Sequence, residues 1–222
     1  FGAYSSHVCV PRHQVFTISD DSKFTPDQWA AFPTVFLSAY HGLFQNIVVK
    51  PGMNILVHSA AGGVGGALIQ LGKIAGCRMT GVVGSSHKVN AVTDFGADVV
   101  IDKHTEGLWA RAEATCPDGF DVIYDGNGPA TLKQSYLHLA PVGKLVAYGF
   151  HSMLSNTNYP GYNQTQAHIS LGATMEMIGG LQSSILILQG EGDWQTPLVE
   201  ALLLEQALMD AGHRDHKLYT YP

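Results

Sequence analysis

Cysteine is scarce in this sequence of 222 residues. The three cysteines, Cys9, Cys77 and Cys116, are far apart and form no C-x-x-C pair. A disulfide framework needs an even set of cysteines, and a cysteine zinc site needs closely spaced ones. We therefore expect three reduced thiols and a protein of the cytoplasm.

Positive charge and long apolar runs are also scarce. Lys and Arg together number 12 against 18 Asp and Glu, which gives a formal net charge of −6. No basic cluster is long enough to follow a phosphate backbone, so we expect no nucleic-acid partner. No apolar run approaches the roughly 18 residues of a membrane span, so we expect none. The chain is still 45% hydrophobic, enough to bury a core.

The middle of the chain alternates short apolar strands with helices. Apolar segments predict strands at 54–59, 79–84, 98–102, 120–126 and 143–149. Helical patterns separate them at Val64–Ala75, His87–Phe95, 105–115 and 129–139. Strands that are apolar on both faces are typical of a covered parallel sheet. The pattern predicts an α/β fold with a doubly wound parallel (Rossmann) sheet.

The chain outside this core is less regular. Short strands are expected around Pro11, within residues 3–18. A helix is expected after Thr25, which suits the N-cap, with Pro26 in the first turn and Gln28 completing a capping box. Pro33 is expected to break or kink that helix.

The last third of the sequence begins with a polar segment rich in Asn, Ser, Gln and Tyr, which predicts an irregular loop. A β-α-β pattern follows, with strands at 183–189 and 216–221 and a helix at 196–211. The first of these strands is expected to lie parallel beside 143–149, because its apolar run needs cover on both faces. The predicted domains are 1–48, a catalytic-domain remnant with a connecting helix; 49–150, a dinucleotide-binding domain; 151–182, a loop; and 183–222, the β-α-β tail.

Four glycines, Gly62, Gly63, Gly65 and Gly66, separate the first parallel strand from its helix. A glycine turn at a helix N-terminus offers free N–H groups and a positive dipole end to a pyrophosphate. The pattern Ala60-x-x-Gly63-x-x-Gly66 stands in the strand–turn–helix context of the dinucleotide fingerprint. The alternative is a tight turn without a ligand.

The second parallel strand bears on the choice of nucleotide. NAD sites usually place Asp or Glu at its end to bind the ribose 2′-OH. Here the strand ends in "VVGSSHKVN", which offers no carboxylate but has Ser85, Ser86 and Lys88, with His87 as a further donor. We therefore predict NADP(H) as the cofactor. The alternative is a helix capped by serine beside an ordinary surface lysine.

Six stretches resemble the medium-chain dehydrogenase/reductase family, in its zinc-free quinone-oxidoreductase-like branch and the vesicle amine transport protein 1 group. They are "GAYSSHVCVP", "AAFPTVFLSAYHGLF", "VKPGMNILVHSAAGGVGGALIQLGK", "GADVVIDK", "GFDVIYDGNG" and "GKLVAYGFHSML". They fall within residues 1–154 in the family's order. The resemblance implies a β-rich catalytic-domain remnant at the N-terminus, and we expect the chain to be a fragment or a fusion.

The same resemblance implies a cofactor site. Gly62 to Gly65 would hold the pyrophosphate, Lys103 would join the serines and Lys88 at the 2′-phosphate, and Asn127 with the 148–150 turn would lie near the nicotinamide. The implied cofactor-binding residues are Ala61, Gly62, Gly63, Val64, Gly65, Ser85, Ser86, Lys88, Lys103, Asn127, Tyr148, Gly149 and Phe150.

No metal is expected, because Thr34 stands where zinc-dependent relatives place a cysteine ligand and cannot supply a thiolate. The resemblance also implies a small-molecule substrate and leaves a homodimer open. No catalytic residue can be assigned.

The tail 183–222 resembles the C-terminal end of an α/β hydrolase. Asp193 matches the aspartate that orients the catalytic histidine, and Ser170 loosely matches a nucleophile. His168 replaces the first glycine of the G-x-S-x-G turn, however, and Ser170 and Asp193 lie too close in the sequence for a working triad.

Three functions are therefore weighed. The first is an NADPH-dependent oxidoreductase acting on quinones or enones, or its cofactor-binding fragment, with weak or no turnover expected from this chain. The second is an NADP-binding module without turnover. The third is a serine hydrolase fragment.

Overall fold

The computed structural model describes residues 5–128, 130–149, 185–190 and 216–221. These residues belong to two compact units, Phe1–Thr34 and Val35–Pro222, which are described separately.

The first unit contains a short 3-10 helix, Arg12–Gln14, and the start of helix α1, Pro26–Tyr40. Residues 5–18 form no strand, so the expectation of short strands around Pro11 is wrong. All their side chains are exposed, and no described segment of this unit pairs with them to form a ladder. A proline also has no N–H to donate to a neighbouring strand.

The capping box predicted at the start of α1 is confirmed. The backbone N–H of Thr25 donates to Gln28 Oε1 at 2.9 Å, and the N–H of Gln28 donates to Thr25 Oγ1 at 3.3 Å. The helix runs through Pro33 to Tyr40, so the proline does not end it. A proline removes only one N–H from the helix, and the turns on either side retain theirs.

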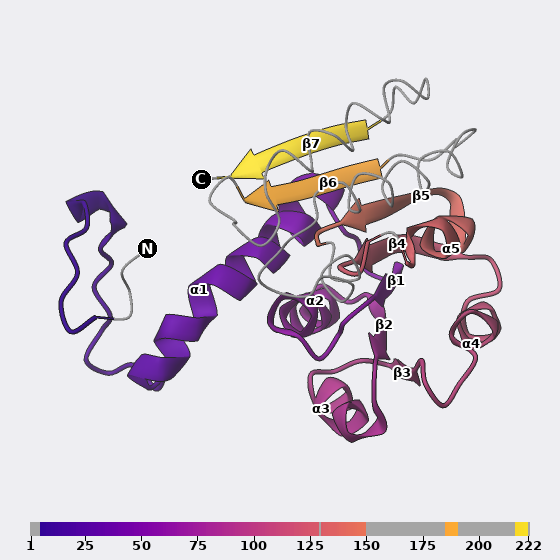
Figure 1. The fold of residues 1–222 in the computed structure, drawn as a ribbon, viewed down its shortest axis with the longest axis horizontal. Coiled ribbons are helices and arrows are strands. Elements are labelled where there is room, and N and C mark those ends of the chain that lie inside the picture. The colour runs from indigo at the N-terminus through magenta and orange to yellow at the C-terminus, as the bar shows by residue number, and fades with distance from the viewer. Residues whose placement is uncertain (1–4, 129, 150–184, 191–215, 222) are drawn as a thin grey trace, which may run out of the picture. The chain divides into compact units, whose positions relative to one another are not determined.

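The second unit is built on seven parallel strands in the order β3-β2-β1-β4-β5-β6-β7 (Figure 1). The strands are β1 (Asn54–Val57), β2 (Arg78–Val83), β3 (Val99–Asp102), β4 (Phe120–Asp125), β5 (Leu139–Ala147), β6 (Ile185–Gly190) and β7 (His216–Tyr221). Strands β2 and β3 are added on one side of β1, and β4 and the later strands are added on its other side. This is the doubly wound arrangement that the sequence predicts, and β6 lies parallel beside β5 as expected.

Helices follow the strands at the predicted places. A π-helix, His41–Ile47, precedes β1, and a 3-10 helix, Ser86–Lys88, follows β2. The α-helices are α2 (Gly63–Ile74), α3 (Val89–Asp94), α4 (Leu108–Thr115) and α5 (Leu132–Leu137). The helix expected over 129–139 is shorter because β5 already begins at Leu139. The expected loop at 151–182 and helix at 196–211 lie outside the described residues.

The core confirms that the central strands are covered on both faces. In β1, Ile55 and Val57 belong to a buried cluster with residues of α2 and α3, whereas Leu56 belongs to a cluster with residues of α4 and α5. All three side chains are fully buried. Because successive side chains of a strand point to opposite faces, this alternation holds the carboxyl ends of the strands in one rigid edge.

Candidate cofactor site

The residues predicted to bind a cofactor follow the carboxyl ends of neighbouring strands. The turn 58–63 follows β1, residues 84–88 follow β2, Lys103 follows β3, and residues 126–128 follow β4. All these strands are parallel, so their carboxyl ends meet at one edge of the sheet. Between β1 and β4 the strand order reverses direction, and in doubly wound folds ligands bind at such a point.

Helix α2 begins at this edge without a side-chain cap. Its N-cap residue, Gly62, is extended and offers no side-chain acceptor, and the first helical bond runs from the N–H of Gly66 to the carbonyl of Gly62. Within the described chain, the N–H groups of Gly63, Val64 and Gly65 have no acceptor. Gly62 and Gly63 are exposed. Free N–H groups at the positive end of a helix dipole suit an anion such as a pyrophosphate.

Close packing explains three of the four glycines. A Cβ on Gly65 would lie 2.3 Å from the carbonyl oxygen of Ser59, and one on Gly63 would lie 2.6 Å from Val35 Cγ1. A Cβ on Gly66 would lie 3.0 Å from a ring carbon of Phe95. These glycines bring α2 against the turn and its neighbours whether or not a ligand binds. Gly62 has slightly more room, because an added Cβ would make a tight contact of 3.2 Å with the carbonyl oxygen of Ser59.

Ser59 lies in the turn after β1 and was not predicted. Its φ of 53° places a residue with a side chain in the left-handed region, a conformation that costs free energy. The exposed serine donates from Oγ to Asn127 Oδ1 at 3.1 Å. This bond joins the turns after β1 and β4 and orients the Asn127 amide so that its NH₂ group faces away from Ser59.

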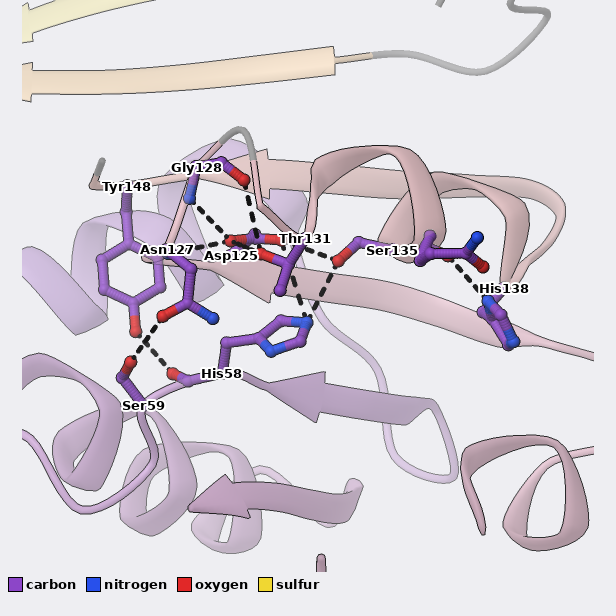
Figure 2. Close-up of polar contacts among 10 residues, drawn as sticks. His58, Ser59, Asp125, Asn127, Gly128, Thr131, Ser135, His138 and Tyr148 are labelled. Atoms are coloured by element: carbon purple, nitrogen blue, oxygen red, sulfur yellow. Dashed lines mark hydrogen bonds and ion pairs between the residues drawn. The ribbon is translucent and has the colours of Figure 1, made fainter. Parts of the chain in front are cut away.

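Asp125, at the end of β4, organises the turn that carries Asn127 (Figure 2). Its fully buried Oδ1 accepts the backbone N–H groups of Asn127 at 2.9 Å and Gly128 at 3.1 Å, and the hydroxyl of Thr131 at 2.9 Å. Its Oδ2 accepts the hydroxyl of Ser135 at 2.7 Å. Four donors thus compensate for the loss of solvent around this carboxylate.

His58 extends this network from the end of β1. Its Nε2 lies 3.0 Å from Ser135 Oγ, and Figure 2 shows the serine between the imidazole and the carboxylate. Because Ser135 gives its hydrogen to Asp125, Nε2 of His58 must carry the proton that it donates to Ser135. Burial lowers the pKa of His58, and the Asp125 charge only partly opposes this, so the ring is neutral. Its Nδ1 is buried without a partner among the described residues.

These three residues are no hydrolase triad. In a triad the histidine lies between the serine and the carboxylate, and the serine faces the substrate. Here Ser135 lies in the middle and is fully buried. Ser170 and Asp193, which the sequence matches to a hydrolase nucleophile and aspartate, lie outside the described residues.

Tyr148 packs over the same edge. Its hydroxyl donates to the carbonyl of His58 at 2.9 Å, and burial followed by the Asp125 charge raises the pKa of the phenol. A Cβ on Gly126 would lie 2.9 Å from the tyrosine ring, and one on Gly149 would lie 2.9 Å from the carbonyl of Gly126. The structure therefore brings Asn127, Tyr148 and Gly149 together. Phe150 lies outside the described residues.

The second part of the predicted site follows β2 and β3. The N–H of Lys103 donates to the carbonyl of Val83 at 3.1 Å, and Lys103 Cε lies 3.5 Å from the position of a Cβ on Gly84. The lysine side chain therefore lies over the segment that leads to Ser85 and Ser86. Lys88 is exposed at the end of the 3-10 helix. Neither lysine forms an ion pair within the described part of the chain.

A carboxylate from the neighbouring strand β3 lies beside these residues, although the end of β2 itself has none. Asp102 Oδ2 accepts the hydroxyl of Ser86 at 2.5 Å, and Oδ1 accepts the N–H of His104 at 3.0 Å. Asp102 is only 3% exposed, and the bonds from Ser86 and His104 lower the pKa of its carboxyl. The sequence at the end of β2 does not reveal this contact, because Asp102 ends β3 and pairs in register with Val83.

The described residues offer neither a metal site nor a membrane-spanning helix. Among them, no group of three or more His, Cys, Asp or Glu side chains could hold a metal ion. None of the described helices is both long and apolar enough to cross a membrane. The absence of a catalytic zinc, expected because Thr34 stands at the position of a cysteine ligand, therefore stays a prediction.

Comparison with known proteins gives consistent matches. The family model of the zinc-binding dehydrogenases matches residues 63–184. The human synaptic vesicle membrane protein VAT-1 homolog is 32% identical over 154 residues, which cover 69% of this chain and 39% of the human protein. The chain thus spans about two fifths of the length of this relative.

Two solved structures share the fold. The quinone oxidoreductase from Thermus thermophilus, described with its NADPH complex, has a TM-score of 0.60 and 25% identity, over 90% of this chain and 57% of its own. The Escherichia coli quinone oxidoreductase complexed with NADPH has a TM-score of 0.58 and 25% identity, over 84% and 52%.

Proposed function

We propose that this chain, which belongs to the zinc-binding dehydrogenase family, is the NADPH-binding part of an oxidoreductase that reduces a small molecule. The observation that carries the proposal is the uncapped N-terminus of α2 at the strand-order reversal, beside the lysines that follow β2 and β3. The two quinone oxidoreductases with similar folds were solved with NADPH, which supports the same cofactor here.

The pyrophosphate would bind at residues 61–65. Free N–H groups of α2 would donate to its oxygens, because no side chain caps the start of this helix. The positive end of the helix dipole adds a favourable interaction without a full counter-charge. Ala61 and Val64 line this turn and would contact the cofactor through their backbone.

The 2′-phosphate would bind after β2. Lys88 and Lys103 would supply two cations that form no ion pair with any described residue, and Ser85 would supply a hydroxyl. Lys88 lies in the segment that follows β2 and Lys103 directly follows β3, so a phosphate between them would be held from two sides. Charge-assisted hydrogen bonds of this kind are among the stronger polar contacts in proteins.

The nicotinamide end would lie over the turns after β1, β4 and β5. Asn127, fixed by Ser59 and by the Asp125 network, would present its NH₂ group as a donor to the carboxamide. Tyr148 and Gly149 would form the floor, and Phe150 remains a predicted contact. When bound, the nicotinamide supplies the hydride, and the role of these residues is to hold and orient the ring.

The proposed hydride acceptor is a quinone or an activated enone. Because this chain spans only part of its relatives' length, the activity is proposed for a full-length protein of this kind. Zinc-free chemistry, a cytoplasmic location and a homodimer remain predictions. An NADP-binding module without turnover is the second candidate, and it shares every residue of the cofactor site. Binding of NADPH without its oxidation in the presence of acceptors would favour this second candidate.

The experiment that tests the binding site uses two variants of Gly62. Gly62→Asp places a carboxylate at the N-cap, which should stabilise α2 by capping its N–H groups and should repel a pyrophosphate. Gly62→Ala adds the same Cβ without charge and serves as the control. Calorimetric titration should show NADPH binding lost in the aspartate variant and retained in the alanine variant, while thermal unfolding shows both folded. Equal binding in both variants would contradict the proposed pyrophosphate site.

A further inference from the structure

The strongest feature that the proposed function does not use is the contact between Ser86 and Asp102. Ser86 follows β2 and is exposed, whereas Asp102 ends β3 and is buried. The register of the two strands places Val83 opposite Asp102, so the contact is built into the sheet. It lies where the ribose of a dinucleotide meets the protein in a doubly wound fold.

The direction of this hydrogen bond is fixed by chemistry. An ionised carboxylate only accepts hydrogen bonds, so Ser86 must donate its single hydroxyl hydrogen to Asp102. The second oxygen of Asp102 is already engaged by the N–H of His104. Both contacts favour the ionised carboxyl at neutral pH. The lone pairs of Ser86 Oγ are therefore the part of this hydroxyl left for a ligand.

We propose that Asp102 sets the balance between NADPH and NADH by holding the Ser86 hydroxyl as an acceptor toward the ribose. This inference rests on the proposed function. A serine oxygen that accepts a hydrogen bond suits the 2′-OH of NADH, because that hydroxyl has a hydrogen to donate. It does not suit the 2′-phosphate of NADPH, because the ionised phosphate has no hydrogen to donate at neutral pH. The Asp102 charge also repels a phosphate, whereas Lys88 and Lys103 attract it. Asp102 therefore reduces the ratio of NADPH to NADH affinity that the two lysines raise.

The proposal assigns different roles to neighbouring residues. Lys88 and Lys103 bind the phosphate, and Ser86 contributes nothing to it while Asp102 is ionised. In Asp102→Asn, the side-chain oxygen can still accept from His104 while the NH₂ group donates to Ser86. The Ser86 hydrogen is then free to donate to the phosphate.

Three variants test this in the full chain by calorimetric titration with NADPH and NADH. Asp102→Asn should bind NADPH about tenfold more tightly, the effect of one charge-assisted hydrogen bond, with NADH binding unchanged within about twofold. Ser86→Ala alone should leave NADPH affinity within about twofold of the original protein. In the Ser86→Ala background, Asp102→Asn should lose most of its gain, and only the effect of charge removal should remain.

Two results would overturn the proposal. One is an unchanged ratio of NADPH to NADH affinity in Asp102→Asn. The other is a tenfold or greater loss of NADPH affinity in Ser86→Ala, which would mean that Ser86 donates to the phosphate. Ser86→Ala changes an exposed side chain and keeps the test available if Asp102→Asn does not fold. Failure of the proposed function looks different, because the unmodified chain would then bind neither nucleotide.

Discussion

His58, which follows β1, and Asp125, which ends the adjacent strand β4, have Nε2 and Oδ2 3.8 Å apart. Ser135 bridges them by accepting from the histidine and donating to the carboxylate. This arrangement keeps His58 neutral, because a protonated ring would be buried with an Nδ1–H that has no acceptor among the described residues. The same carboxylate holds the turn that carries Asn127. The network therefore links the stability of the fold to the geometry of the candidate nicotinamide site.

The first prediction concerns pH. Burial holds the pKa of His58 below its ordinary value of 6.5, so the unfolded chain binds this proton more readily than the folded one. The stabilisation from neutral His58 is fully present above about pH 6.5 and is lost as the pH falls toward the folded pKa. Between pH 7.5 and 5.5, His58 should contribute a slope of at most about 1.4 kcal/mol per pH unit to the free energy of unfolding.

Urea unfolding of His58→Gln measures that contribution. Glutamine can still donate to Ser135 but cannot titrate, so the slope of stability against pH should become shallower. Identical slopes in the original chain and in His58→Gln would show that the buried imidazole does not couple protons to folding.

The second prediction separates the roles of the glycines. Gly65→Ala forces a Cβ against the backbone oxygen of Ser59, whereas Gly62→Ala makes only a tight contact with the same atom. Gly65→Ala should lower the free energy of unfolding by about 1–3 kcal/mol or more, as overpacking does, and Gly62→Ala should change it much less. Chemical denaturation compares the two variants. Equal losses would mean that packing does not distinguish these glycines.

Much of the fold could be predicted because each element carries its own local signal. Apolar strands covered on both faces, the glycine turn and the capping box of Thr25 and Gln28 are patterns within a few residues, and the structure confirms them. The strands expected around Pro11 failed because a strand depends on a partner for its hydrogen bonds. An exposed segment with β-forming residues does not supply that partner.

The candidate site was only partly predictable, because several of its contacts join distant positions. Ser86 and Asp102 meet through the register of β2 and β3, and His58 meets Ser135 across 77 residues of sequence. Neither pair leaves a local pattern. Asp125 did have a signal, since a strand ending in Asp-Gly-Asn-Gly favours a turn organised by that carboxylate. Applying the same rule at the end of β3 would have drawn attention to Asp102.

The third prediction concerns Lys88. Removing its cation with Lys88→Ala should weaken NADPH binding by about 1.5–3 kcal/mol, the value of a hydrogen bond to a charged group, and leave NADH nearly unaffected. Lys50→Ala is the matched control, because this exposed lysine precedes β1 at the opposite end of the strand. Calorimetry gives both affinities. An equal loss for both nucleotides would place Lys88 away from the 2′-phosphate.

The central claim is that this edge of the sheet binds NADPH through its 2′-phosphate. The most direct measurement is calorimetric titration of the unmodified chain with NADPH and with NADH under the same conditions. We expect NADPH to bind at least about tenfold more tightly than NADH, because Lys88 and Lys103 attract the phosphate and the Asp102 charge offsets only part of that attraction. Equal affinities for the two nucleotides, or no binding of either, would contradict it.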